Sequence, residues 1–145
     1  MGLLDRFGTD RVALLVDGPN VFREEFDVDL AELSQTGKTF GSLAVARIYF
    51  DEQASSGLLQ AAEAHGFEAV VTSGDVDVRL AVDATELAVE ELVDVLAIVS
   101  RDMDFKPALE TAKRHGVKTV AIAPGEHGRS GGLEAVADEA ITLGD

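Results

Sequence analysis

Short apolar runs alternate with longer amphipathic segments along almost the whole chain. The runs are bounded by glycine, aspartate, serine or other turn formers, a pattern typical of buried β-strands. The predicted strands are Arg11–Val16, Ser42–Phe50, Phe67–Thr72, Asp94–Ser100 and Val117–Ala123, and a last apolar segment follows at Ala140–Leu143. Between them, apolar residues at helical spacing predict the helices Asp29–Thr36, Gln53–His65, Asp77–Leu92, Asp104–His115 and Leu133–Ala137.

Glycines mark the ends of several of these elements. Gly37 is predicted to stop the first helix, and Gly66 and Gly116 are predicted to close two later ones in a left-handed conformation. The predicted loops are Asp17–Asn20, Ser73–Asp75 and a mobile, glycine-rich segment, Pro124–Gly132, which carries His127 as a possible substrate contact.

Alternating strands and helices predict an α/β fold with a mainly parallel sheet covered by helices on both faces, a three-layer α/β/α sandwich. Right-handed crossovers bring the loops that follow each strand to one edge of such a sheet, where the binding crevice lies. The length of 145 residues fits one domain, with a core from about residue 11 to residue 143.

The composition, 46% apolar and 27% charged, is that of a globular protein. No apolar run reaches the roughly 20 residues of a membrane span, and the first residues, Met1–Arg6, lack the features of a signal peptide. The absence of cysteine excludes disulfides, thiolate metal sites and a cysteine nucleophile. We therefore expect a cytoplasmic protein with no membrane partner.

The net charge of −15, from 27 acidic and 12 basic residues, is the unusual feature of the composition. An acidic surface with only four lysines and small core residues indicates a halophilic protein. In dilute buffer this charge would repel nucleic acid. At molar salt the Debye length falls to ~3 Å, so the charge does not exclude a polyanionic substrate.

Aspartates follow four of the predicted strands. The first strand ends at Asp17, the second runs into Asp51, the third leads to Asp75 and Asp77, and the fourth leads to Asp102 and Asp104. Carboxylates brought together repel one another unless a cation neutralises them, and hard oxygen ligands suit Mg²⁺ or Mn²⁺. Any single aspartate here is explained as well by loop chemistry, but the set predicts a metal site.

The helix Asp77–Leu92 has apolar residues on more than one side. Winding it at about 100° per residue gathers a broad apolar face, which we predict to be the buried one. That face comprises Val78, Ala81, Val82, Ala88, Val89 and Leu92. Leu80 and Leu87 lie off this face, so the helix is a candidate for being covered on two sides, and Asp83 falls among the solvated residues. Asp77 is interpreted as a helix N-cap, as a carboxylate facing the crevice, or as both.

The sequence does not decide the roles of the residues that follow the fourth strand. One of Asp102 and Asp104 is expected to bind metal while the other caps the helix, and Arg101 is equally well explained as a phosphate contact or as a counter-charge. His65 and His115 precede helix-ending glycines, where a cation complements the helix dipole.

Three segments together resemble the NYN domain, a branch of the PIN-like ribonuclease superfamily. They are Val16–Val21, Ser73–Asp83 and Val99–Phe105, in the family's order and at ordinary spacing. The resemblance implies a PIN-like fold and an acidic pocket that binds Mg²⁺ or Mn²⁺ and cleaves RNA. It covers the chain from about Arg11 to Leu143.

The resemblance also assigns residues. It implies that Asp17, Asp77, Asp102 and Asp104 are catalytic and hold one or two metal ions. Asn20, Ser100 and Arg101 would support them, and Asp83 matches an often acidic family position of lower rank. Two departures stand out: Arg101 replaces the motif glycine, and Gly74-Asp75 replaces a frequent lysine, which weakens the expectation of tight phosphate binding.

Other functions remain open at this point. A metal-dependent phosphatase or a receiver domain also gathers aspartates at strand ends, but a receiver needs a lysine after its last strand, and here Ala121–Ala123 is followed by Pro124. A catalytically weak module that binds RNA or protein is the non-enzymatic alternative. With 6% aromatic residues and no basic stripe, the sequence offers little for base stacking, so a protein partner or a homo-oligomer stays plausible.

Overall fold

The computed structural model of the chain describes residues 10–22, 28–125 and 131–144. His127 and most of the predicted loop Pro124–Gly132 lie outside these residues. Within them, no helix is long and apolar enough to cross a membrane.

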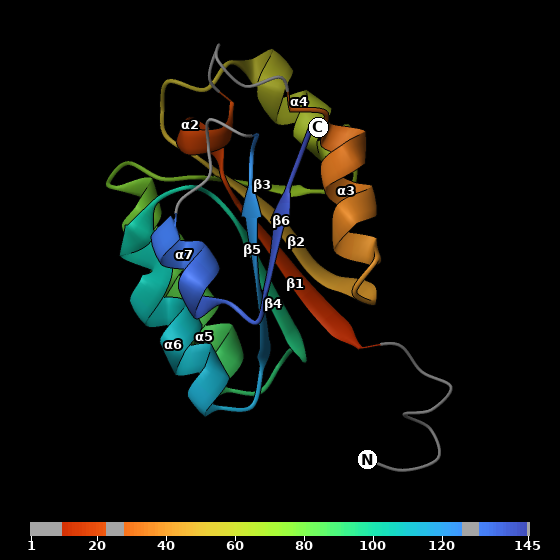
Figure 1. Cartoon of the computed structure of the whole chain (residues 1–145). Helices are drawn as coiled ribbons and strands as arrows, with labels where there is room; N and C mark the ends of the chain where they lie inside the picture. Colours follow the sequence, from red (N-terminus) through yellow and green to blue (C-terminus); the bar gives the residue numbers. More distant parts are fainter. Residues whose placement is uncertain (1–9, 23–27, 126–130, 145) are drawn as a thin grey trace.

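A six-stranded sheet forms the centre of the molecule, and all of its neighbouring strands pair in parallel (Figure 1). Its strands are β1 (Arg11–Asp17), β2 (Ser42–Phe50), β3 (Glu68–Val71), β4 (Val95–Val99), β5 (Lys118–Ala123) and β6 (Glu139–Thr142). They lie in the order β3-β2-β1-β4-β5-β6, so the chain builds one half of the sheet outward from β1 and then crosses back to build the other half. The segment Ala140–Leu143 thus supplies most of an edge strand.

Helices cover both faces of the sheet, as predicted. Helices α3 and α4 pack on one face, and α5, α6 and α7 pack on the other (Figure 1). Their bounds are α2 (Gly18–Val21), α3 (Leu30–Lys38), α4 (Ser56–Ala64), α5 (Val76–Val89), α6 (Lys106–Arg114) and α7 (Gly131–Val136), with a 3₁₀ turn at Met103–Phe105. The mixed α/β sandwich that the sequence predicts is confirmed.

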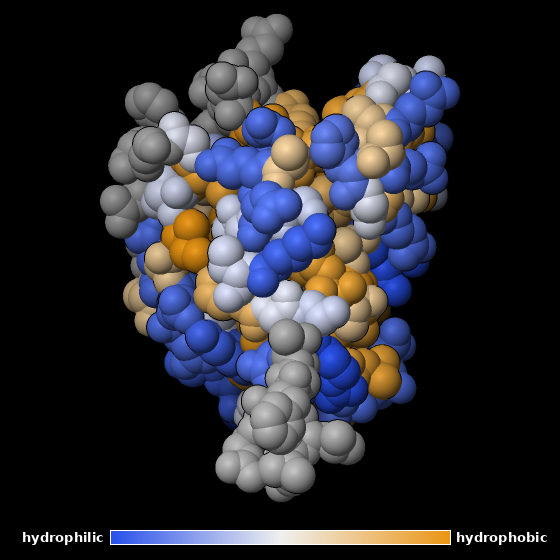
Figure 2. Space-filling view, turned by 90° about the vertical axis from the view of Figure 1, so that its right-hand side faces the viewer, coloured by the Kyte–Doolittle hydropathy of each residue, from blue (hydrophilic) through white to orange (hydrophobic). Residues whose placement is uncertain are grey.

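The face that carries α3 and α4 shows hydrophilic and apolar side chains interspersed across its surface (Figure 2). Beneath these helices, Leu33 and Ala62 are buried against the sheet together with Val21 of α2. The inner side of this layer is apolar, and its outer surface is mixed.

Most helix ends agree with the sequence. Gly66 and Gly116 have φ values of +88° and +77°, which confirms their left-handed caps. Gly37, in contrast, does not stop α3 but lies inside it. A Cβ at Gly37 would lie 2.8 Å from Leu14 Cδ2, so the helix approaches β1 closely at this glycine. The predicted loop at Asp17–Asn20 is also wrong in part, since Gly18–Val21 forms one helical turn with proline at its start.

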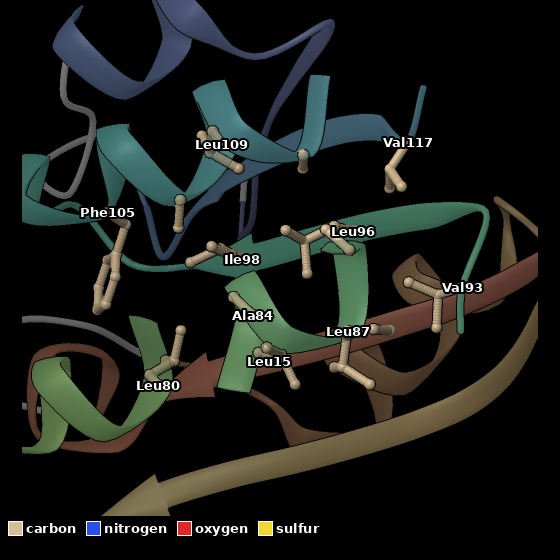
Figure 3. Close-up of a cluster of buried hydrophobic side chains, with 14 of the residues drawn as sticks. Leu15, Leu80, Ala84, Leu87, Val93, Leu96, Ile98, Phe105, Leu109 and Val117 are labelled. Atoms are coloured by element: carbon tan, nitrogen blue, oxygen red, sulfur yellow. The ribbon is translucent and has the colours of Figure 1, made fainter. Parts of the chain in front are cut away.

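The buried face of α5 is not the one predicted. The side chains that enter the core are Leu80, Ala84 and Leu87, which lie beside Leu15 and Ile98 of the sheet (Figure 3). Of the predicted face, only Ala88 is fully buried, whereas Val78 and Val82 are 57% and 58% exposed. Both sides of the helix are apolar, so the helical wheel alone could not choose between them. The side with the larger leucines is the one buried in the core.

Candidate functional site

The order of the strands reverses between β1 and β4, because the chain leaves the sheet after β3 and returns on the other side of β1. In open parallel sheets, ligands bind in the crevice at the carboxyl ends of the strands on either side of such a reversal. The structure has a cleft of about 390 Å³ at this place. It is lined by Asp17, Pro19, Asn20, Asp51, Gly74, Asp75, Val76, Asp77 and Asp102. Five of these residues are aspartates and none is basic.

Asp17 is the buried acid of the cleft, with 5% of its surface exposed. Burial raises the pKa of its carboxyl to about 6, although hydrogen bonds from the Ser100 hydroxyl and the Asn20 backbone oppose the shift. The negative charges of Asp102 and Asp77 raise the pKa further. An acid that is buried, surrounded by other acids and still hydrogen-bonded in its ionised form is suited to a site that takes up positive charge.

Position 18, directly after Asp17, has no room for a side chain. A Cβ on Gly18 would overlap the carbonyl oxygen of Tyr49 and would approach Phe50 Cδ1 at 2.9 Å. The chain therefore turns tightly against β2 immediately after β1, and this turn carries Asn20 to the cleft.

Side chains of Asn20 in α2 and of Ser100 hold the segment after β4 in place. The backbone N–H of Arg101 donates to Asn20 Oδ1 at 3.0 Å, and the N–H of Asp102 donates to Ser100 Oγ at 3.0 Å. Asp102 in turn caps the 3₁₀ turn, since its Oδ1 accepts from the N–H of Asp104 at 2.9 Å. Asn20 and Ser100 thus fix the positions of the backbone and the carboxylates. Of Asp102 and Asp104, it is Asp102 that caps the helical turn.

Three carboxylates come together at the mouth of the cleft. One oxygen each from Asp77, Asp102 and Asp104 lies within 4.8 Å of the other two. Their repulsion is visible at Asp104, where the neighbouring Asp102 and then Asp77 raise the pKa of the carboxyl. Asp77 is not the helix N-cap, because Asp75 occupies that position and Asp77 lies in the first turn of α5. Its Oδ1 accepts from the adjacent N–H of Val78 at 3.0 Å, and its carboxyl group also interacts with that of Asp104.

Comparison with known proteins identifies the family. Residues 11–144 match the NYN domain. The chain belongs to the NYN domain family. This family is part of the PIN-like nuclease superfamily, and the resemblance found in the three sequence segments is confirmed.

Two relatives extend this finding. An uncharacterized protein of Methanocaldococcus jannaschii is 43% identical over 140 residues, which cover 97% of this chain and 58% of that protein. The NYN chain therefore spans little more than half the length of this relative. A crystal structure of a Vibrio parahaemolyticus protein of unknown function superposes with a TM-score of 0.80 at 23% identity and covers 94% of both chains, which shows the same fold.

Asp83 of the NYN domain lies apart from the acidic cleft, and it is not the solvated residue that the helical wheel predicted. Its side chain is 13% exposed and accepts a hydrogen bond of 2.7 Å from the Tyr49 hydroxyl. Arg79 Nε lies 3.3 Å and Arg47 Nη1 3.5 Å from its carboxylate. This network ties α5 to β2, so Asp83 supports the position of the helix that carries Asp77.

Three contributors to this arrangement were not assigned as site residues of the NYN domain. Asp51 and Asp75 belong to the aspartates at strand ends but are not among the predicted ligands, and both line the cleft. Tyr49 is the only tyrosine of the chain, and its hydroxyl on a fully buried residue could have signalled a polar partner in the core.

Proposed function

We propose that this NYN domain hydrolyses RNA phosphodiester bonds with the help of Mg²⁺ or Mn²⁺ held in the acidic cleft. The observation that carries the proposal is the convergence of Asp77, Asp102 and Asp104 within 4.8 Å, beside the buried Asp17 and in a cleft without a basic lining residue. Membership of a nuclease superfamily supports the same reading.

The residues present fit a divalent cation. Asp17, Asp77, Asp102 and Asp104 offer only hard oxygen donors, and a cation would offset the burial that mainly raises the pKa of Asp17 and the repulsion that mainly raises the pKa of Asp104. Such an ion supplies an activated water nucleophile near neutral pH and stabilises the charge that develops on the phosphate.

The protein's own contribution is to fix the carboxylates before substrate arrives. Ser100 holds Asp17 through its hydroxyl, Asn20 holds the backbone of Arg101, and the Asp102 cap holds Asp104. Each of these bonds joins elements that are far apart in sequence or fixes the turn after β4. The aspartates therefore need little rearrangement when a cation and substrate bind.

Cations beside the cleft are placed to contact the RNA backbone. Lys106 lines a neighbouring cleft of about 480 Å³ together with Asp77 and Asp104. Arg101 lies between Ser100 and Asp102, half-buried. We assign both to phosphate contacts, which would offset part of the repulsion between RNA and a chain of charge −15.

Cleavage of labelled single-stranded and structured RNA tests the proposal directly. Reactions at low and at molar KCl would each contain Mn²⁺, Mg²⁺ or EDTA, and Mn²⁺ binding would be measured separately by calorimetry. Asp102→Asn is expected to lose both cleavage and Mn²⁺ binding. Asp10→Asn is the matched control, because Asp10 is exposed and precedes β1 at the opposite edge of the sheet.

The two readouts separate the alternatives. Metal-dependent cleavage that Asp102→Asn abolishes and Asp10→Asn retains supports the nuclease. Binding of Mn²⁺ without cleavage of any RNA at either salt would contradict it and favour a binding module, and folded protein that binds no metal would contradict the metal site as well.

A further inference from the structure

Helix α5 carries an exposed apolar face that the nuclease proposal does not use. Among the residues that the structure describes, six large apolar side chains are at least 45% exposed, and all of them lie on α5 or close to its ends. They are Val71, Val78, Val82, Val89, Leu92 and Met103. Val71 and Met103 line clefts that they share with Val78, so they adjoin the helix face. Exposed apolar groups gathered in this way mark an interaction surface.

The spacing along this face is that of a helix-pairing seam. Val78, Val82, Thr85 and Val89 of α5 follow one another at intervals of four, three and four residues, the repeat by which two helices interlock, and Leu92 follows just beyond the end of the helix. A groove of about 470 Å³ along the seam is lined by Ala81, Val82, Thr85, Glu86, Val89 and Glu90. Thr85 already donates its hydroxyl to the carbonyl oxygen of Ala81 at 2.8 Å, so burying it leaves no unpaired donor.

The charges beside the seam match those of a second α5 that runs in the opposite direction. Arg79 lies beside the N-terminal half of the seam, and Glu86 lies seven residues later on the same flank. If a second α5 runs antiparallel about a two-fold axis between Val82 and Thr85, each Val78 faces a partner Val89 and each Arg79 faces a partner Glu86. Both side chains are exposed, and Arg79 Nε also lies 3.3 Å from Asp83 of its own helix.

We propose that the occupant of this face is a second copy of the chain, which packs its α5 antiparallel to the first and forms a two-fold symmetric dimer. The repulsion between two chains of charge −15 opposes the contact at low salt. Molar salt screens that repulsion and strengthens apolar burial, so the dimer tightens as the KCl concentration rises. The groove from Ala81 to Glu90 contains none of the proposed metal ligands, although the Val78 end of the face adjoins Asp77 and Asp104, and the inference does not depend on the nuclease proposal.

Sedimentation velocity of the whole chain at low and at molar KCl tests the dimer over a range of protein concentrations. Val82→Glu is expected to weaken dimerisation at least ~10-fold, since it places a charge at the centre of the seam. Gln60→Glu is the matched control, because it adds the same charge at an exposed position of α4, on the other face of the sheet. Circular dichroism verifies that each variant is folded.

A charge exchange tests the antiparallel register. Arg79→Glu alone and Glu86→Arg alone each set like charges across the axis and should weaken the dimer. An equimolar mixture of the two variants restores opposite charges on both sides and should dimerise as the wild type does. If the protein stays monomeric at every salt and protein concentration, the proposal is wrong and the face is left to a different protein. A dimer that Val82→Glu leaves intact also overturns the proposal. Failure of the mixture to dimerise overturns the antiparallel arrangement.

Discussion

The hydroxyl of Ser100 donates a hydrogen bond of 3.0 Å to Oδ2 of Asp17. Both residues are buried, and the bond joins the end of β1 to the residue after β4, where the strand order reverses. The same oxygen of Ser100 accepts from the N–H of Asp102. One small side chain therefore positions the buried acid of the cleft and the segment that carries the two outer ones.

Replacing Ser100 by alanine should affect both stability and the pH range of activity. The hydrogen bond from Ser100 lowers the pKa of Asp17, so its loss lets the pKa rise above about 6. We expect the metal-dependent activity of the wild type to fall as the pH drops toward 6, because protons compete with the metal for Asp17, and we expect this midpoint to move to higher pH in Ser100→Ala. The N–H of Asp102 also loses its acceptor, at a cost of about 1–3 kcal/mol in the free energy of unfolding.

A pH–rate profile at fixed Mn²⁺ concentration and a denaturant titration measure the two effects. Ser100→Thr retains the hydroxyl and should keep the midpoint of the wild type. An unchanged midpoint in Ser100→Ala would contradict the role given to the hydrogen bond.

Asp17→Asn should make the metal-free protein more stable at neutral pH. The folded state raises the pKa of Asp17 from 3.8 to about 6, so between these values it holds a proton that the unfolded chain has released. The free energy of unfolding therefore falls as the pH rises through this window, by about 3 kcal/mol in total. Asparagine has no proton to lose and should not show this fall.

Denaturant unfolding in EDTA from pH 4 to pH 8 gives the comparison. The difference between the variant and the wild type should grow in favour of the variant as the pH rises from 4 to about 6, and it should level off at higher pH. A constant difference over this range would show that Asp17 ionises normally in the folded protein.

Asp77 and Asp83 should separate metal binding from stability, although they lie on one helix. Asp77→Asn removes a carboxylate from the acidic cluster and should lower the affinity for Mn²⁺ by ~10-fold or more, with little loss of stability. Asp83→Asn removes the charge that faces Arg47 and Arg79 and should cost about 1–2 kcal/mol of stability while Mn²⁺ still binds.

Calorimetric titration with Mn²⁺ and thermal unfolding of both variants provide the measurements. If Asp83→Asn lost Mn²⁺ binding at unchanged stability, Asp83 would belong to the metal site after all.

Gly18→Ala should be among the most destabilising single changes in the chain. The added Cβ overlaps the backbone oxygen of Tyr49, which cannot move without shifting β2, so we expect a loss above ~3 kcal/mol. Gly57→Ala in α4 is the matched control, because a Cβ there meets nothing within 4 Å. The control should stabilise the helix by a few tenths of a kcal/mol to about 1 kcal/mol, as alanine is the better helix former. Equal thermal unfolding midpoints for the two variants would contradict the steric argument.

The elements of the fold could be predicted because each depends on a local pattern. An apolar run between turn formers predicts β2 to the residue, and the left-handed glycines after α4 and α6 end those helices as expected. The burial of α5 could not be predicted in the same way. Its two apolar faces are equally compatible with a helical wheel, and only packing against Leu15 and Ile98 selects the face with Leu80 and Leu87.

The candidate site, like the fold, could be predicted in some parts and not in others. Aspartates at the ends of parallel strands must meet at one edge of the sheet, so the placement of Asp17 and Asp102 in one cleft followed from topology. The bond of Tyr49 to Asp83 and that of Asn20 to the N–H of Arg101 span 34 and 81 residues, and neither leaves a local signal in the sequence. The metal ligands themselves stay a prediction until binding is measured.

The reversal of strand order also determines when the cleft can form. The bond between Asp17 and Ser100 closes a loop of 83 residues, and the pairing of β1 with β4 must order the chain between them. Contacts so distant in sequence form late in folding, after the local helices, because the entropy of the intervening chain opposes them. A refolding chain therefore has helices before it has a cleft, and the return of Mn²⁺ binding during refolding would time the closure of the sheet.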